Sequence, residues 1–162
     1  GYLAEKTARD FVKAKPYHPR GPYRLAQQLC DQENILEGLE WIEKGIAMTP
    51  MQVELHTLKV HYLSRLHRWD DALAACSPKE FAQHPQPALL VERADLLEHR
   101  GDIEGAIDAT KQAVAIDADY YTAWTRLADW YRGIGNRKAY LEAAENLVRL
   151  NPNSAIPHGY LY

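Results

Sequence analysis

A period of 34 residues runs along this chain. Pro50 lies 34 residues after Pro16, and Pro152 lies three such intervals after Pro50. A fixed period of this length predicts a repeat protein, in which each repeat buries its apolar side against its neighbours. We expect one array over residues 1–162. It divides into the second half of a repeat (1–18), four full repeats (19–52, 53–86, 87–120 and 121–154) and the start of a further repeat (155–162).

One position of the repeat holds small side chains. The twentieth residue is Ala4, Gly38, Ala72 and Ala106 in successive repeats, before Tyr140 ends the series. Because a larger side chain would hold two backbones apart, this column predicts a close crossing of two helices in each repeat.

Each repeat also has the pattern of two helices joined by a turn. The helical period of apolar residues in 87–120 predicts one helix from about Ala88 to His99 and another from about Ile103 to Ile116. Between them, Gly101 suits the left-handed residue that ends a helix, and Asp102 can cap the next one. The run GIGN at 133–136 repeats this turn chemistry.

The repeat resembles that of the tetratricopeptide repeat (TPR) family. Trp124, Leu127, Ala128 and Tyr131 match the run of the family's first helix, with alanine in place of glycine, and Pro152 closes the repeat. The resemblance covers essentially the whole chain. It implies an all-α fold, a right-handed α-α superhelix of helix–turn–helix repeats, whose members bind peptides or assemble complexes and are not themselves catalytic.

The aromatic residues of the run WTRLADWYRG have two interpretations. Trp124 and Tyr131 lie on one helical face with Leu127, at positions that the family uses for packing, and Trp130 has Leu96 and Tyr62 at the equivalent places. We therefore interpret these aromatics as core between helices and not as a ligand box.

The repeat at 53–86 departs from the pattern. Pro78 falls inside its second helix, where a proline removes a backbone hydrogen bond and clashes with the preceding turn. We expect the helix to stop near Cys76 and a short turn to carry Phe81 back to the core. The irregularity is interpreted as drift in a tolerant array; the alternative is a kink that changes curvature or forms a local docking site.

Composition excludes several classes of protein. The formal net charge of −3 leaves no cationic excess for nucleic acid, and no apolar run approaches the roughly 20 residues that cross a bilayer, so no membrane insertion is expected. Cys30 and Cys76 fall in helical patterns and are interpreted as small buried hydrophobes. This usage is compatible with a reducing compartment, and the cytoplasm is the favoured location. Because the chain opens in mid-repeat, we expect it to be a piece of a longer protein.

No residue pattern indicates an active site. The seven histidines form no zinc-hydrolase motif, neither cysteine has metal-site spacing, and no glycine-rich phosphate loop is present. We therefore expect no enzyme activity, no catalytic residue, no metal and no cofactor.

In the family, first helices of successive repeats line a concave groove. Carried across position by position, the resemblance implies a partner-binding surface of Tyr23, Gln27, Thr57, His61, Arg65, Val91, Asp95, Glu98, Thr125, Asp129 and Arg132. The family's clamp for C-terminal carboxylates is absent, since its places hold residues such as Leu58, Ala88 and Glu92. The acidic half of the groove suits a segment carrying lysine or arginine, or it is a solvated face that keeps the array soluble.

The sequence thus favours a protein–protein interaction scaffold that binds a peptide segment or partner domain in this groove. Two alternatives stay open. One is a regulatory or substrate-presenting segment of a larger enzyme, and the other is a structural module that self-associates or docks onto another domain of its own chain. The lopsided charge, with six Lys/Arg against Glu5 and Asp10 in residues 1–24, is compatible with the latter.

Overall fold

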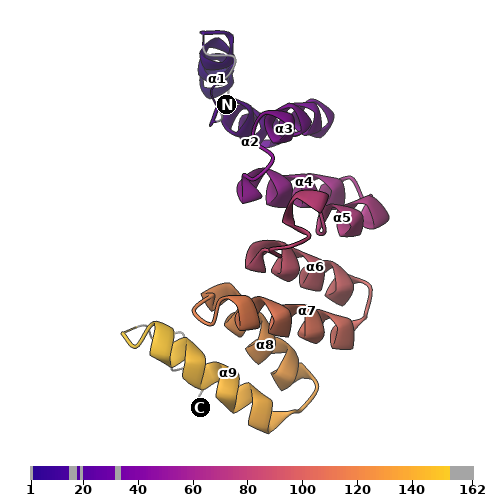
Figure 1. The fold of residues 1–162 in the computed structure, drawn as a ribbon, viewed down its shortest axis with the longest axis vertical. Helices are drawn as coiled ribbons and strands as arrows, with labels where there is room; N and C mark the ends of the chain where they lie inside the picture. Colours follow the sequence, from indigo (N-terminus) through magenta and orange to yellow (C-terminus); the bar gives the residue numbers. More distant parts are fainter. Residues whose placement is uncertain (1, 15–17, 19, 32–33, 154–162) are drawn as a thin grey trace. The chain divides into compact units, whose positions relative to one another are not determined.

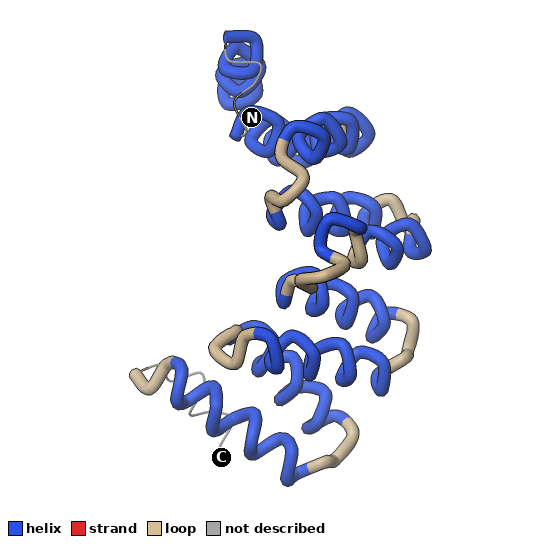
Figure 2. Tube along the Cα trace, in the orientation of Figure 1, coloured by secondary structure: helices blue, strands red, loops and turns tan. Residues whose placement is uncertain are grey.

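The computed structural model of the chain describes residues 2–14, 18, 20–31 and 34–153. These residues form nine α-helices and one 3-10 helix, without a strand (Figure 2). The predicted all-α class is therefore confirmed. The elements are α1 (Tyr2–Ala14), α2 (Arg20–Asp31), α3 (Ile35–Met48), α4 (Val53–Arg65), α5 (Trp69–Ala75), η1 (Lys79–Phe81), α6 (Pro87–His99), α7 (Ile103–Ile116), α8 (Tyr121–Gly133) and α9 (Arg137–Leu150).

The chain divides into two compact units, an N-terminal unit of residues 1–84 and a C-terminal unit of residues 85–162. In the N-terminal unit α2 packs on α1 and α3, and α4 packs on α3 and α5. In the C-terminal unit the pairs are α6 with α7, α7 with α8, and α8 with α9 (Figure 1). Each helix thus buries its apolar stripe against its neighbours in sequence. The start of a further repeat predicted at 155–162 lies outside the described residues.

The predicted turn chemistry is present in the C-terminal unit. Gly101 and Gly135 have φ angles of 83° and 72°, in the left-handed region that glycine adopts without steric cost. The Asp102 carboxylate accepts a 2.9 Å hydrogen bond from the Gly105 backbone N–H, and the Asn136 side chain accepts one of 3.2 Å from Ala139. These side chains satisfy backbone donors that a helix start would otherwise leave unpaired.

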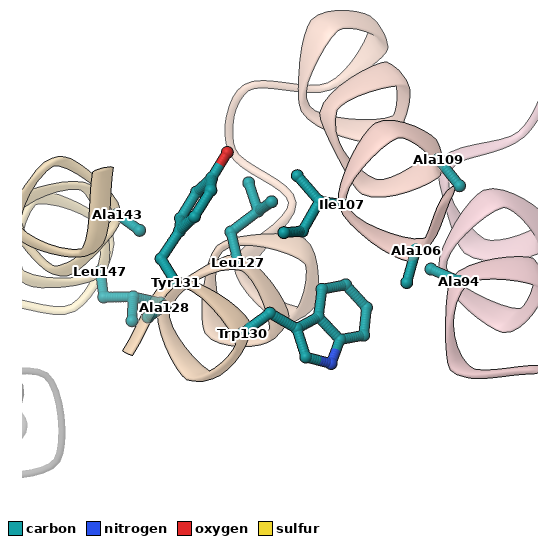
Figure 3. Close-up of a cluster of buried hydrophobic side chains, with 10 residues drawn as sticks. All are labelled: Ala94, Ala106, Ile107, Ala109, Leu127, Ala128, Trp130, Tyr131, Ala143 and Leu147. Atoms are coloured by element: carbon teal, nitrogen blue, oxygen red, sulfur yellow. The ribbon is translucent and has the colours of Figure 1, made fainter. Parts of the chain in front are cut away.

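The helices cross closely at three of the four small residues of the predicted column, whereas Ala4 of α1 is exposed. Ala72 and Ala106 are fully buried, and Figure 3 shows Ala106 of α7 beside Ala94 of α6. Gly38 lies so near α4 that a Cβ atom added to it would be 2.6 Å from a ring carbon of Tyr62. Any larger residue here would require the Tyr62 ring to shift.

The repeat at 53–86 is irregular in the expected way. Helix α5 ends at Ala75, Pro78 has an extended backbone, and η1 places Phe81 in the core with 4% of its surface exposed. The Phe81 ring stands edge-on to that of His56 at 5.2 Å. Both parts of the prediction for this repeat, the early stop and the return of Phe81, are confirmed.

The aromatic residues of α8 belong to the packing of the C-terminal unit. Trp130 and Tyr131 are buried in a cluster that α6, α7, α8 and α9 share (Figure 3), and Trp124 packs against the same cluster with its side chain partly exposed. The indole N–H of Trp124 donates a 2.8 Å hydrogen bond to the Ala118 carbonyl. The interpretation of these residues as core is therefore confirmed for Trp130 and Tyr131 and holds in part for Trp124.

Two further sequence-based expectations concern the burial of the cysteines and the absence of a membrane-spanning helix. Cys76 is buried, as expected of a small hydrophobe, whereas the side chain of Cys30 lies outside the described set. Across the described ranges, no helix is both long enough and apolar enough to span a bilayer.

Candidate functional site

In the N-terminal unit the residues predicted to meet a partner lie on α2 and α4. Gln27, His61 and Arg65 are exposed, and Tyr23 and Thr57 are partly exposed. The two helices are joined directly, because the hydroxyl of Tyr62 donates a 2.6 Å hydrogen bond to the Ala26 carbonyl. The structure therefore places accessible polar side chains on two first helices that are in contact.

In the C-terminal unit the predicted residues lie on α6 and α8. Glu98 and Arg132 are exposed, and Asp95, Thr125 and Asp129 are partly exposed. Val91 differs from the others: only 5% of it is exposed, and it forms a buried cluster with Ala113 and Ala123. Its side chain packs inside the unit and so cannot meet a partner, whereas the other five can.

A charged contact joins α6 and α8. Arg126 Nη2 donates a 2.8 Å hydrogen bond to Asp95 Oδ2, from a residue 31 positions later in the chain. The second pair of atoms, Arg126 Nε and Asp95 Oδ1, lies 2.7 Å apart but without hydrogen-bond alignment, so it is a charge contact only. Both side chains remain partly exposed, at 41% for arginine and 33% for aspartate. Sequence reasoning did not identify Arg126.

Burial and charge shift the acid–base behaviour of this cluster. Burial raises the pKa of Asp95, although the bond to Arg126 opposes the shift. Burial likewise raises the pKa of Glu92 to about 6, helped by the nearby charge of Asp95 and opposed by Arg126. The same cause raises the pKa of Tyr120, which also lies near Glu92. The bond to Asp95 raises the pKa of Arg126, which therefore stays charged.

The acidic residues of α6 and α8 differ in their partners. Asp95 binds Arg126, and Asp129 accepts a 3.1 Å bond from Arg132 in an exposed pair three residues apart on α8. Among the described residues Glu92 and Glu98 have neither a hydrogen bond nor an ion pair. The partly buried Glu92 carboxyl group thus has no hydrogen-bond or ion-pair partner among these residues, although the charge of Arg126 acts on it. Its position three residues before Asp95 could have identified it, because residues at that spacing share a helical face.

We define the α6–α8 face as the surface formed by Glu92, Asp95 and Glu98 of α6 with Arg126, Asp129 and Arg132 of α8. It holds four carboxylates and two guanidinium groups, so it is acidic when all are ionised. Nothing in the described ranges gathers three potential metal ligands. The chemistry this face offers is electrostatic recognition.

Comparison with known proteins identifies the class. Residues 87–130 match the family model described as tetratricopeptide repeat. No curated protein matches the chain in sequence. Residues 87–130 are thus similar to a tetratricopeptide repeat, within a chain that is all-helical over its described residues and built of successive hairpins.

Solved structures share this fold over nearly the whole chain. The thermophilic TPR protein TTC0263 of Thermus thermophilus is 19% identical, with 97% of this chain and 87% of that chain covered and a TM-score of 0.76. MamA residues 41 to the end from Desulfovibrio magneticus RS-1 is 14% identical over 95% of this chain and 87% of that chain, with a TM-score of 0.64. YrrB, a TPR protein with an unusual peptide-binding site, is 14% identical over 99% of this chain and 84% of that chain, with a TM-score of 0.63. At these identities the likeness concerns the fold.

Proposed function

We propose that this protein binds a partner protein or peptide through the first helices of its repeats, and that the α6–α8 face takes a segment carrying lysine or arginine. The observation that carries the proposal is Glu92, a partly buried carboxyl group without a described hydrogen-bond partner beside the Asp95–Arg126 contact. An incoming cation would complete this cluster.

Charge and burial together favour a basic ligand. The face has two more carboxylates than guanidinium groups, and a charge pair formed at a partly desolvated carboxyl is stronger than one formed in open water. Because a cation near Glu92 stabilises its ionised form, it would also lower the raised pKa of that group. The exposed Glu98 and the partly exposed Asp129 would steer a basic segment toward the same place.

Family likeness supports the class of ligand. TPR proteins generally mediate protein–protein contacts, and the peptide-binding site of YrrB supports a peptide as one form of ligand on this fold. In this proposal Thr125 lies within the α8 contact surface. The N-terminal unit contributes Tyr23, Gln27, Thr57, His61 and Arg65. In this proposal the repeats at 19–154 act as one array, and the chain has no enzyme activity of its own.

A crosslinking pull-down from native extract tests the proposal with a charge-reversed variant. Glu98→Lys combined with Asp129→Lys changes one exposed and one partly exposed residue of the α6–α8 face, neither of them in the core, so the fold should persist. Asp108→Lys combined with Glu145→Lys makes the same change of charge on α7 and α9 and is the matched control.

Capture of a protein by the native chain and the control, with loss in the Glu98/Asp129 variant, would support the α6–α8 face. Lysine or arginine in the crosslinked segment of the captured protein would support the proposal that the ligand segment is basic. Equal capture by all three proteins would reject the face as the binding surface.

A further inference from the structure

The early end of α5 leaves an opening in the N-terminal unit. Helices α3, α7 and α9 each have 14 residues, whereas α5 has 7. In α7 the later turns place the apolar Ala113 and Val114 against neighbouring helices. One repeat earlier the same positions hold two charged residues, the exposed Lys79 and the partly exposed Glu80. Two turns of covering helix are therefore missing beside α3 and α4.

A cavity of about 640 Å³ lies at this place, between α3, α4 and α5. Leu39 and Ile46 of α3, Leu63 of α4 and Pro78 after α5 contribute apolar lining. A volume in this range is typical of sites that hold a small ligand or a few side chains of a peptide. All lining residues belong to the N-terminal unit, and the cavity is separate from the α6–α8 face.

The equivalent place in the C-terminal unit shows that the opening is not a general property of the repeat. A smaller cavity of about 290 Å³ lies between α7, α8 and α9. It is lined by Trp124, Leu127 and Tyr131, which stand 68 residues, two repeat lengths, after His56, Lys59 and Leu63 of the larger cavity. Bulky apolar side chains and a full-length helix α9 thus fill the later site, whereas the earlier one is open.

His56, which lines the larger cavity, is fixed by contacts with two other residues of the N-terminal unit. His56 is 3% exposed, its Nε2 lies 2.8 Å from the Pro50 carbonyl oxygen, and its ring packs edge-on against the buried Phe81. A site whose lining is already fixed loses less entropy when a ligand binds.

The rim of this cavity is charged and unbalanced. Lys59 pairs with Glu43 at 2.6 Å, and Arg68 pairs with Asp71 at 2.7 Å. The remaining carboxylates of the lining, Glu40 and Glu80, have no ion pair or hydrogen bond with a described residue. The rim therefore carries two negative charges that no cation of the described chain matches.

We propose that the cavity between α3, α4 and α5 is a second docking site, which takes a peptide segment with an apolar side chain next to lysine or arginine. The apolar side chain fills the space that the missing turns of α5 leave open, and the cation meets Glu40 or Glu80. This site lies between two second helices, α3 and α5, and the first helix α4. One chain therefore holds two partners or two segments of one partner.

Selection of a phage-displayed random heptapeptide library on the 162-residue chain tests this site. Ala74→Trp adds a bulky side chain at an exposed residue of the lining and fills the cavity. Glu142→Trp places the same side chain at the equivalent position two repeats later and is the matched control. Circular dichroism checks that each variant is folded.

The native chain and the control should select peptides that pair an apolar residue with lysine or arginine. Affinity of one selected peptide, measured by fluorescence anisotropy, should fall at least about 10-fold in Ala74→Trp and in Glu40→Lys with Glu80→Lys. The proposal is overturned if no peptide is enriched, if the peptides are acidic, or if they bind Ala74→Trp equally well. Loss of binding in Glu98→Lys with Asp129→Lys, but not in Ala74→Trp, would assign the peptides to the α6–α8 face and also overturn it.

Discussion

Tyr62 of α4 donates a 2.6 Å hydrogen bond to the backbone carbonyl of Ala26 in α2, 36 residues earlier in the chain. Tyr62 is fully buried, and its ring lies against Gly38 of α3. One side chain thus links three helices of two successive repeats. The absence of a side chain at Gly38 is what lets the tyrosine reach its acceptor.

Gly38→Ala should destabilise the protein by up to about 2 kcal/mol. Alanine is the better helix former by about 1 kcal/mol, but its Cβ would lie 2.6 Å from the buried Tyr62 ring, and overpacking of that kind costs about 1–3 kcal/mol. Urea unfolding measures the loss. In a Tyr62→Leu background the penalty of Gly38→Ala should shrink or reverse. Gly133→Ala, where an added Cβ meets nothing within 4 Å, is the control and should be neutral or stabilising.

His67→Gly should stabilise the protein by about 0.5–1 kcal/mol. His67 has a φ angle of 57°, and it occupies the place where the next two repeats have Gly101 and Gly135. A left-handed backbone costs a non-glycine residue about 1–2 kcal/mol. Two effects reduce the gain from His67→Gly: the variant loses the ring contact between His67 and Trp69, and glycine makes the unfolded chain more flexible. Thermal and urea unfolding test this value. Gly101→Ala is the reciprocal variant and should destabilise; a stabilised Gly101→Ala would contradict the argument.

Glu92→Gln should raise stability at pH 7.5 by about 1 kcal/mol and have little effect near pH 4. The pKa of Glu92 is raised from 4.5 to about 6, so as the pH rises through this window the unfolded chain loses its proton first. The stability of the native chain therefore falls as the pH rises from 4.5 to about 6, and above pH 6 the full cost of ionising Glu92 in the folded protein is present. Because Glu92 is partly exposed, solvent screening reduces that cost. Urea unfolding across pH 4–8 measures the difference between variant and native chain. Glu145→Gln, at an exposed residue of α9, is the matched control for the change of side chain.

A double-mutant cycle of Asp95→Asn and Arg126→Gln should give a coupling of about 0.5–1 kcal/mol, because both side chains are partly exposed. The coupling should weaken at high salt. Removal of Arg126 should also raise the pKa of Glu92 further, since that guanidinium group opposes the shift. NMR titration of the Glu92 carboxyl carbon measures this effect. A coupling of zero would mean that α6 and α8 are not joined through this pair in solution.

The helices and their ends were predictable because local chemistry determines them. Gly101 and Asp102 end one helix and begin the next through their own backbone and side-chain preferences, and Pro78 stops α5 by the same kind of local effect. The burial of Phe81 was predictable because a large apolar side chain is more stable in the core than in water, also where the helix before it has ended.

The details of the candidate sites were not predictable, because they depend on how neighbouring helices lie in space. The contact of Asp95 with Arg126 requires the offset between two first helices, which no local pattern contains. Val91 was assigned to the partner-binding surface by its position in the repeat, but the small Ala113 and Ala123 let it pack inward. The cavity beside α5 depends on the volumes of side chains from three helices.

Restoring the missing turns of α5 requires three substitutions together. Pro78→Ala alone should leave the helix short, because extending it would bring Lys79 and Glu80 to the places that Ala113 and Val114 hold one repeat later. Adding Lys79→Ala and Glu80→Val removes that obstacle, so the triple variant should gain helix over residues 76–82.

Backbone NMR chemical shifts of residues 76–82 measure the change directly. The extended helix should also cover the cavity between α3, α4 and α5 and abolish binding of a peptide selected for it, while the α6–α8 face keeps its own ligand. Helix formation in Pro78→Ala alone would show that the proline by itself causes the break. A triple variant that gains helix and still binds the peptide would separate the irregular repeat from the docking site.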